Sequence, residues 1–354
     1  MCNSEKYSAG SQFLITAATF VVIIAGIRSA ESLLVPFLLA LFIAVISAPG
    51  LFWLTRKGIP KALALLIVIS AIIGAGLLLS VLIGASVDDF SRSLPEYKAR
   101  LQEETSGIEN WLAAKGVALP EEMVRESLNP GLVMQLAGKM FSSLSGVLAN
   151  AFFILLTAVF ILLEASSFPI KLRHAMKDPE TTMAHFNHLA QNIKRYVALK
   201  SLTSLATGLA VVVWLWIIGV DYPLLWGLLA FILNFVPNIG SIIAAVPAVL
   251  LAFVQGGYTL LALAAVGYIV VNIVIGNIIE PRIMGKGLGL STLVVFLSLV
   301  FWGWVLGPIG MLLSVPLTMM VKVALESEEQ THWIAVMLGS ESDLEAEVAD
   351  KPAE

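Results

Sequence analysis

The chain has 354 residues, of which 58% are hydrophobic and only 13% charged, and its mean hydropathy is +0.90. A soluble fold of this length would have about a quarter of its residues charged, so the composition indicates a polytopic, all-α membrane protein. A transmembrane β-barrel is disfavoured, because apolar residues run together over roughly 20 positions instead of alternating with polar ones. The net charge of -4 offers no basic surface for nucleic acid, and the single cysteine, Cys2, excludes an intramolecular disulfide.

The first part of the chain, residues 1–87, contains three apolar spans. They cover residues 11–27, 33–54 and 62–87. The loop between the second and the third span carries Arg56, Lys57 and Lys61 and no acidic residue. Because such loops stay in the cytoplasm, we expect this loop and the N-terminus on the cytoplasmic side.

Residues 88–146 are hydrophilic, and we expect them on the non-cytoplasmic side. They hold nine acidic and six basic side chains. Apolar residues at helical spacing predict short helices that pack on each other or on a neighbouring subunit. Asn129 and Pro130 form a helix start, with asparagine as the cap and proline at the first helical position. That helix should project outside the bilayer and return the chain through a span at 147–163.

Residues 164–200 carry six basic and three acidic side chains, which favours a cytoplasmic position. Asp178 and Pro179 start a helix with one apolar face, so we expect an amphipathic helix along the inner membrane surface that feeds a fifth span at 201–220. His185 and His188 stand one turn apart on it. No further ligand accompanies them at a suitable offset, so we predict a solvated face and no metal site.

The core at 201–325 contains two apolar segments that are interrupted in the middle. The first, 224–253, is broken at 234–241, and the second, 292–321, is broken by glycines and a proline between 303 and 310. Each predicts a helical hairpin or a re-entrant segment, and a clean span at 258–279 lies between them. The sequence from Pro237 to Pro247 is echoed from Gly307 to Pro316: in both, Ile-Gly precedes a short apolar run and then Val-Pro. With the other spans this gives about six full crossings and two broken ones.

Paired Gly/Pro-broken segments are typical of a transporter's substrate site, because unwound backbone at membrane depth is tolerated only where it lines a cavity or is buried in protein. The alternative is a pair of tight turns at the membrane edge. We expect the first break to face the second, with Asn234 and Asn238 near Ser314. The predicted substrate path comprises Asn234, Pro237, Asn238, Gly240, Ser241, Asn272, Asn277, Gly307, Pro308, Gly310 and Ser314.

A compact charged cluster follows the predicted span at 258–279. Only four charged side chains lie between Ser201 and Val321, and three of them belong to this cluster. We expect Pro281 to force the chain out of helix, and the charges to pair with each other or with a neighbouring helix end. The cluster is therefore a candidate gate at the inner end of the span, and a topology anchor is the alternative. Its residues are Glu280, Pro281, Arg282, Gly285 and Lys286.

The tail, residues 326–354, holds nine acidic residues and one lysine, and we expect it to extend into the cytoplasm.

The run at 234–240, the motif from Glu280 to Lys286 and the closing run from Gly307 to Pro316 resemble the signature of the autoinducer-2 exporter family of bacterial inner-membrane proteins. The resemblance implies a permease for a small solute: autoinducer-2 for some relatives, and exchange of sodium or lithium for protons for others. It also implies homo-oligomers, with a pentamer as one form. Relatives usually carry an aromatic residue and a second proline where this chain has Asn238 and Ser241.

A neutral organic solute fits the residues better than an alkali cation. A proton-coupled cation exchanger usually needs a carboxylate within the membrane, and here Glu164, Asp221 and Glu280 all fall at the ends of predicted spans. The asparagines of the predicted path could instead bind a polar solute by hydrogen bonds. No nucleotide-binding or metalloprotease motif is present, so no enzyme activity and no cofactor are expected. Transport would then follow the solute's own gradient or be coupled to a proton or sodium ion, and a non-transporting scaffold is the remaining alternative.

Overall fold

The structure is a computed structural model that describes residues 9–114, 150–165, 171, 173–174, 179–237, 239–284, 289–326 and 331–340. Over these residues the regular structure is helical throughout, and no strand occurs among them. Five helices are long and apolar enough to cross a membrane, and three shorter apolar helices accompany them. The prediction of an all-α polytopic membrane protein is therefore confirmed.

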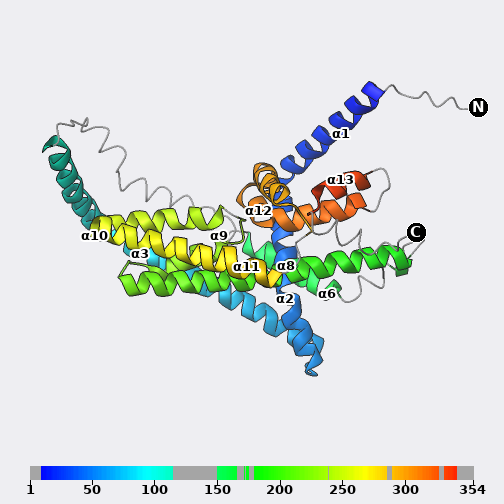
Figure 1. The fold of residues 1–354 in the computed structure, drawn as a ribbon. Coiled ribbons are helices and arrows are strands. Elements are labelled where there is room, and N and C mark those ends of the chain that lie inside the picture. The colour runs from blue at the N-terminus through cyan, green and yellow to red at the C-terminus, as the bar shows by residue number, and fades with distance from the viewer. Residues whose placement is uncertain are drawn as a thin grey trace, which may run out of the picture.

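The helices follow one another along the chain as Figure 1 shows. They are α1 (Ala9–Ser29), α2 (Glu31–Arg56), α3 (Lys61–Ala114), α6 (Ala151–Glu164), α8 (Pro179–Ile218), α9 (Pro223–Leu233), α10 (Gly240–Val271), the π-helix η1 (Asn272–Ile279), α11 (Glu280–Met284), α12 (Thr292–Glu326) and α13 (His332–Leu338). Helices α9 and α10 pack beside α8, and α12 packs with α13 and with the first part of α8.

Two helices are longer than the sequence suggested. The third span continues without interruption into the hydrophilic segment, so that α3 has 54 residues, and the prediction of separate short helices was wrong as far as Ala114. The expected surface helix and the fifth span form a single 40-residue helix, α8, so no turn separates them. The physical reason is that no glycine or proline occurs between Pro179 and Gly208 to break it. Asn129 and Pro130 lie outside the described residues.

Polar contacts between the helices form two groups at separate places along α8. At the C-terminal end of α8, the Asp221 backbone N–H donates to Gln255 Oε1 at 3.0 Å, and Tyr97 Oη donates to Asp221 Oδ2 at 2.7 Å. Where the uncharged part of α8 begins, near the middle of the helix, Lys200 Nζ lies 2.6 Å from Glu280 Oε1. We call these the Asp221 end and the Glu280 end.

The Asp221 end holds the extension of α3 against the core. Burial of Tyr97 raises the pKa of its hydroxyl, and the hydrogen bond to Asp221 raises it further by a smaller amount. The hydroxyl therefore stays protonated and keeps donating to Asp221. Arg100 Nη1 also donates to the Gln255 carbonyl oxygen at 3.2 Å. The hydrophilic extension of α3 is thus bound to Asp221, which follows α8, and to Gln255, near the middle of α10.

Both interrupted segments are helical hairpins. In the first, α9 ends at Leu233 and α10 begins at Gly240. In the second, α12 is broken at Gly307 (φ 65°, ψ -154°). Trp302 Nε1 donates to Thr318 Oγ1 at 3.0 Å. In a straight helix these two residues would be about 24 Å apart along the axis. The halves of α12 therefore fold back on each other.

The sequence echo between the hairpins has a structural counterpart. A Cβ added to Gly240 would lie 1.8 Å from the Leu233 carbonyl oxygen, and one added to Gly310 would lie 2.0 Å from the Trp302 carbonyl oxygen. In both hairpins the glycine of the Ile-Gly pair thus lets the returning helix touch the backbone of the helix before it. We call residues 234–240 the first tip and residues 307–310 the second tip.

The hairpins enter the molecule from opposite ends. The open end of the first is closed by the bond between Asp221 and Gln255, at the Asp221 end. The open end of the second is closed by Lys322 Nζ, which donates to the Gly289 carbonyl oxygen at 2.6 Å. Gly289 is followed by Leu290, which packs against Tyr196 of α8 at the Glu280 end. The two tips consequently point in opposite directions.

Candidate functional site

A stripe of buried polar side chains runs along α8 from the Glu280 end. It consists of Lys200, Thr203, Ser204 and Thr207, each 5% exposed or less. Their spacing of three, four and seven residues places them on one face of the helix. We call them the α8 polar stripe. Burying polar groups is costly unless they are hydrogen-bonded, so such a stripe within an apolar helix marks a site of function.

Most groups of the stripe have partners within the protein. Thr203 and Thr207 donate to backbone oxygens of their own helix, at 3.2 and 2.9 Å. Ser204 Oγ accepts a hydrogen bond of 3.0 Å from Asn234 Nδ2 of the first tip. The adjacent Ser201 hydroxyl is buried and finds no partner among the described residues. An unsatisfied buried hydroxyl at this place is suited to receive a ligand or a water molecule.

Two glycines let the first tip reach the stripe. A Cβ on Gly208 would lie 2.8 Å from the Gly227 carbonyl oxygen, and one on Gly227 would lie 2.7 Å from the Gly208 carbonyl oxygen. Helix α9 therefore lies directly on α8, as small residues allow in membranes. On its other side the tip is closed by an edge-to-face contact between Phe235 and Phe42 of α2, with ring centroids 5.7 Å apart.

A buried ion pair closes the stripe at the Glu280 end. Glu280 binds Lys200, and the two side chains are only 15% and 7% exposed. The sequence led us to expect Glu280 to pair with Arg282 or with a helix end, and it pairs instead with a lysine 80 positions earlier. Arg282 is exposed. The two opposite charges satisfy each other, which a single buried charge could not do.

The expectation that Pro281 ends the helix was wrong. The chain remains helical from η1 into α11, with Pro281 as its second residue. The missing N–H of Pro281 falls where the π-helix η1 passes into the α-helix α11, so the bond it removes lies at a point where the hydrogen-bonding pattern changes in any case. The span at 258–279 is also not uniform, since Asn272 and Asn277 belong to the eight-residue π-helix η1. Segments of π-helix are rare and occur often at functional sites.

Among the other residues of the predicted path, Pro237 and Gly240 belong to the first tip, Ser241 follows in α10, and Asn272 and Asn277 lie in η1, which packs against α8. Asn238, Gly285 and Lys286 are outside the described residues, and Ser314 is fully buried, with its hydroxyl donating to the Met311 carbonyl oxygen at 2.8 Å. The expected pairing of Asn234 with Ser314 is replaced by the bond to Ser204.

The two tips lie against different positions of α2. The first tip contacts Phe42 of α2, whereas the second lies near Glu31, where a Cβ on Gly307 would be 3.3 Å from Glu31 Oε1. These two positions on α2 are about 16 Å apart along the helix axis. Gly307, Pro308 and Gly310 therefore lie at a different position along the α2 axis from Asn234.

The α8 polar stripe was missed in the sequence. Lys200 was counted among the basic residues of a cytoplasmic segment, although it is the last charged residue before a long uncharged run. The spacing of Thr203, Ser204 and Thr207 along one helix face was the available signal.

A multi-pass helical protein with two broken hairpins inserted from opposite ends, and with buried polar groups beside one tip, has the architecture of a secondary transporter. Residues 14–329 match the family described as AI-2E family transporter. The chain belongs to this family. It is 41% identical to the AI-2 transport protein TqsA of Escherichia coli (strain K12), over 96% of this chain and 97% of the relative.

Two further relatives bear the names of transport proteins without a stated solute. One is a putative transport protein of Haemophilus influenzae, 40% identical over 93% of this chain and 97% of the relative. The other is the putative transport protein YhhT of Escherichia coli (strain K12), 37% identical over 93% of this chain and 95% of the relative. These names point to transport and away from an enzyme.

Proposed function

We propose that this protein moves a small, neutral, polar organic molecule such as AI-2 across the bacterial inner membrane. The observation that carries the proposal is the α8 polar stripe, together with the buried and unpartnered hydroxyl of Ser201. Hydroxyl and amide groups that are fixed by helices can exchange hydrogen bonds with a polar solute in surroundings that exclude water.

The charges of the site favour a neutral solute. Lys200 and Glu280 compensate each other, so the stripe carries no net charge. A charged solute would leave an uncompensated charge in a region of low dielectric constant, which costs several kcal/mol (~3 or more). The similarity to TqsA, an AI-2 transport protein, supports the same substrate class. For these reasons sodium or lithium exchange is not part of the proposal.

We propose that the Lys200–Glu280 pair is the gate of the path at the Glu280 end. It lies between the stripe and the exposed Arg282, so a solute leaving the stripe on this side must pass it or displace it. The proposal also places the N- and C-termini and the Glu280 end in the cytoplasm, following the basic loop at Arg56, Lys57 and Lys61. It includes homo-oligomers, with a pentamer as one form, and a proton or sodium ion as a coupling partner.

Movement of AI-2 across vesicle membranes tests the proposal. We expect vesicles that contain the purified protein to release trapped AI-2 about tenfold faster than protein-free vesicles, because a polar path lowers the cost of crossing the apolar layer. Vesicles with an unrelated multi-pass protein, prepared in the same way, control for leakage. Equal release from all three preparations would leave the protein without this activity and would favour a scaffold.

A further inference from the structure

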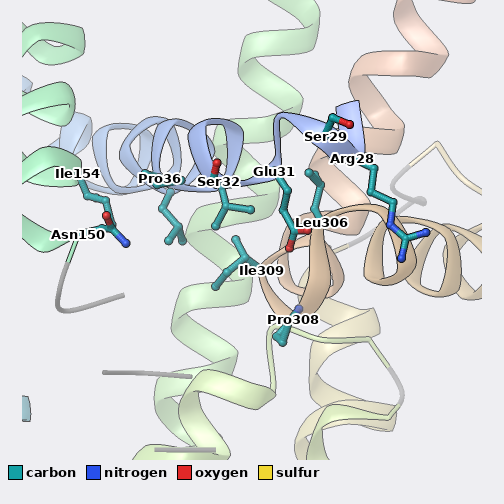
Figure 2. A pocket seen from close by; sticks show the side chains of 12 residues that line it. Arg28, Ser29, Glu31, Ser32, Pro36, Asn150, Ile154, Leu306, Pro308 and Ile309 are labelled. Carbon is teal, nitrogen blue, oxygen red and sulfur yellow. The ribbon is translucent and has the colours of Figure 1, made fainter. Parts of the chain in front are cut away.

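A cavity of about 650 Å³ lies at the second tip, away from the α8 polar stripe. Residues from α1, α2, α6 and α12 line it, together with Asn150 just before α6, as Figure 2 shows. Pockets for small molecules typically have volumes of roughly 300–1,000 Å³.

The polar part of the cavity comes from the start of α2 and the residues just before it. Glu31 extends toward the stretch of α12 that carries Leu306 and Pro308 (Figure 2). Its Oε1 atom lies 3.3 Å from the position of a Cβ on Gly307, the residue at which α12 is broken. Pro308 then opens the returning half of α12, so the carboxylate lies near the start of a helix, where a negative charge is stabilised.

Arg28 supplies the opposite charge at the same end of the cavity as Glu31 (Figure 2). Its guanidinium group lies over the ring of Trp304, 4.9 Å from the ring centroid, and this contact fixes its direction. The lining thus contains one cation and one anion. Ser29 and Ser32 add hydroxyl groups and Asn150 an amide group, and the remaining wall is apolar.

We infer that this cavity binds a neutral, compact molecule with several hydroxyl groups, and that it is a second station of the transport path, in addition to the α8 polar stripe. Hydroxyl groups can donate to the carboxylate of Glu31 and accept from the guanidinium group of Arg28, while the carbon skeleton rests on Leu306 and Pro308. An anionic molecule would meet the Glu31 carboxylate, and a cation would meet Arg28. This inference rests on the proposed function, and it adds a site for the solute.

Cysteine labelling tests the site directly. In a Cys2→Ser background, Ser32→Cys places a thiol in the cavity wall, and Asp89→Cys places one on an exposed position of α3 that does not line the cavity. We expect saturating AI-2 to slow the reaction of Ser32→Cys with a small, neutral thiol reagent about tenfold, and to leave Asp89→Cys unchanged. Glu31→Gln should raise the AI-2 concentration needed for protection about tenfold, since a hydrogen bond to a charged group is replaced. If Ser32→Cys does not fold, Ser29→Cys in the same lining takes its place.

The same preparations are measured for release of AI-2 from vesicles, so that the two claims can fail separately. Unchanged labelling of Ser32→Cys in a protein that transports AI-2 would overturn the site and leave the proposed function standing. Equal protection of both cysteines would also overturn the site, because it would show that the effect is not local. Loss of protection together with no transport by the wild-type protein would overturn the proposed function itself.

Discussion

In the variant Glu280→Gln, we expect AI-2 release from vesicles to fall about tenfold or more, and the free energy of unfolding to fall by roughly 3 kcal/mol. The reason is that Lys200 is only 7% exposed at its side chain and would lose the carboxylate 2.6 Å from its Nζ. An uncompensated buried charge is among the most destabilising changes in a protein. Thermal unfolding in detergent and release from vesicles measure the two effects.

A matched double variant separates gating from stability. Lys200→Met with Glu280→Leu replaces both charges by apolar groups of similar size, which is often neutral or stabilising for the fold. We expect this variant to unfold like the wild type and still to transport poorly, because the pair can no longer open and close the path. Wild-type transport by the double variant would show that the ion pair serves the fold alone.

In the variants Gly240→Ala and Gly310→Ala, we expect the hairpins to lose their packing. The free energy of unfolding should fall by about 3 kcal/mol for each variant. The added Cβ would lie 1.8 or 2.0 Å from a backbone carbonyl oxygen, and a backbone atom cannot move aside as a flexible side chain can. Thermal unfolding and size-exclusion chromatography measure the result.

Gly76→Ala is the control for these two variants, since a Cβ at Gly76 of α3 meets nothing within 4 Å. Alanine should be neutral or slightly stabilising there, because it favours helix more than glycine does. Destabilisation by only one of the two tip variants would contradict the equivalence of the hairpins.

The sequence predicted those features of the fold that depend on local composition. Apolar runs indicated the spans, and the breaks at 234–241 and at Gly307 indicated the two hairpins, because glycine and proline clustered within a few positions favour an interruption of the helix. The continuation of α8 through residue 200 was missed, since a change from amphipathic to fully apolar composition was taken for a change of direction. The prediction for Pro281 was wrong because this proline lies at the junction of η1 and α11, where the chain stays helical although one backbone N–H is missing.

The candidate site was predicted only in part, because its contacts join distant segments. Glu280 was singled out by its charge, but Lys200, which binds it, lies 80 positions away and looked like one of several cytoplasmic lysines and arginines. Asn234 was also singled out, although its partner, Ser204, sits in a helix with nothing unusual in its local composition. Burial, which distinguishes these polar side chains from ordinary ones, is a property of the folded molecule.

The central claim, that the solute passes along the α8 polar stripe beside the first tip, is tested most directly by AI-2 release from vesicles containing the double variant Asn234→Leu with Ser204→Ala. Replacing both hydrogen-bonding partners by apolar groups can be nearly neutral for stability, so the fold should survive. Trp302→Phe with Thr318→Val removes a comparable hydrogen bond within α12 and serves as the control. We expect the first variant to unfold like the wild type but to release AI-2 about tenfold more slowly, while the control keeps wild-type release. A folded Asn234→Leu, Ser204→Ala protein that releases AI-2 at the wild-type rate would contradict the claim that the solute passes along the stripe.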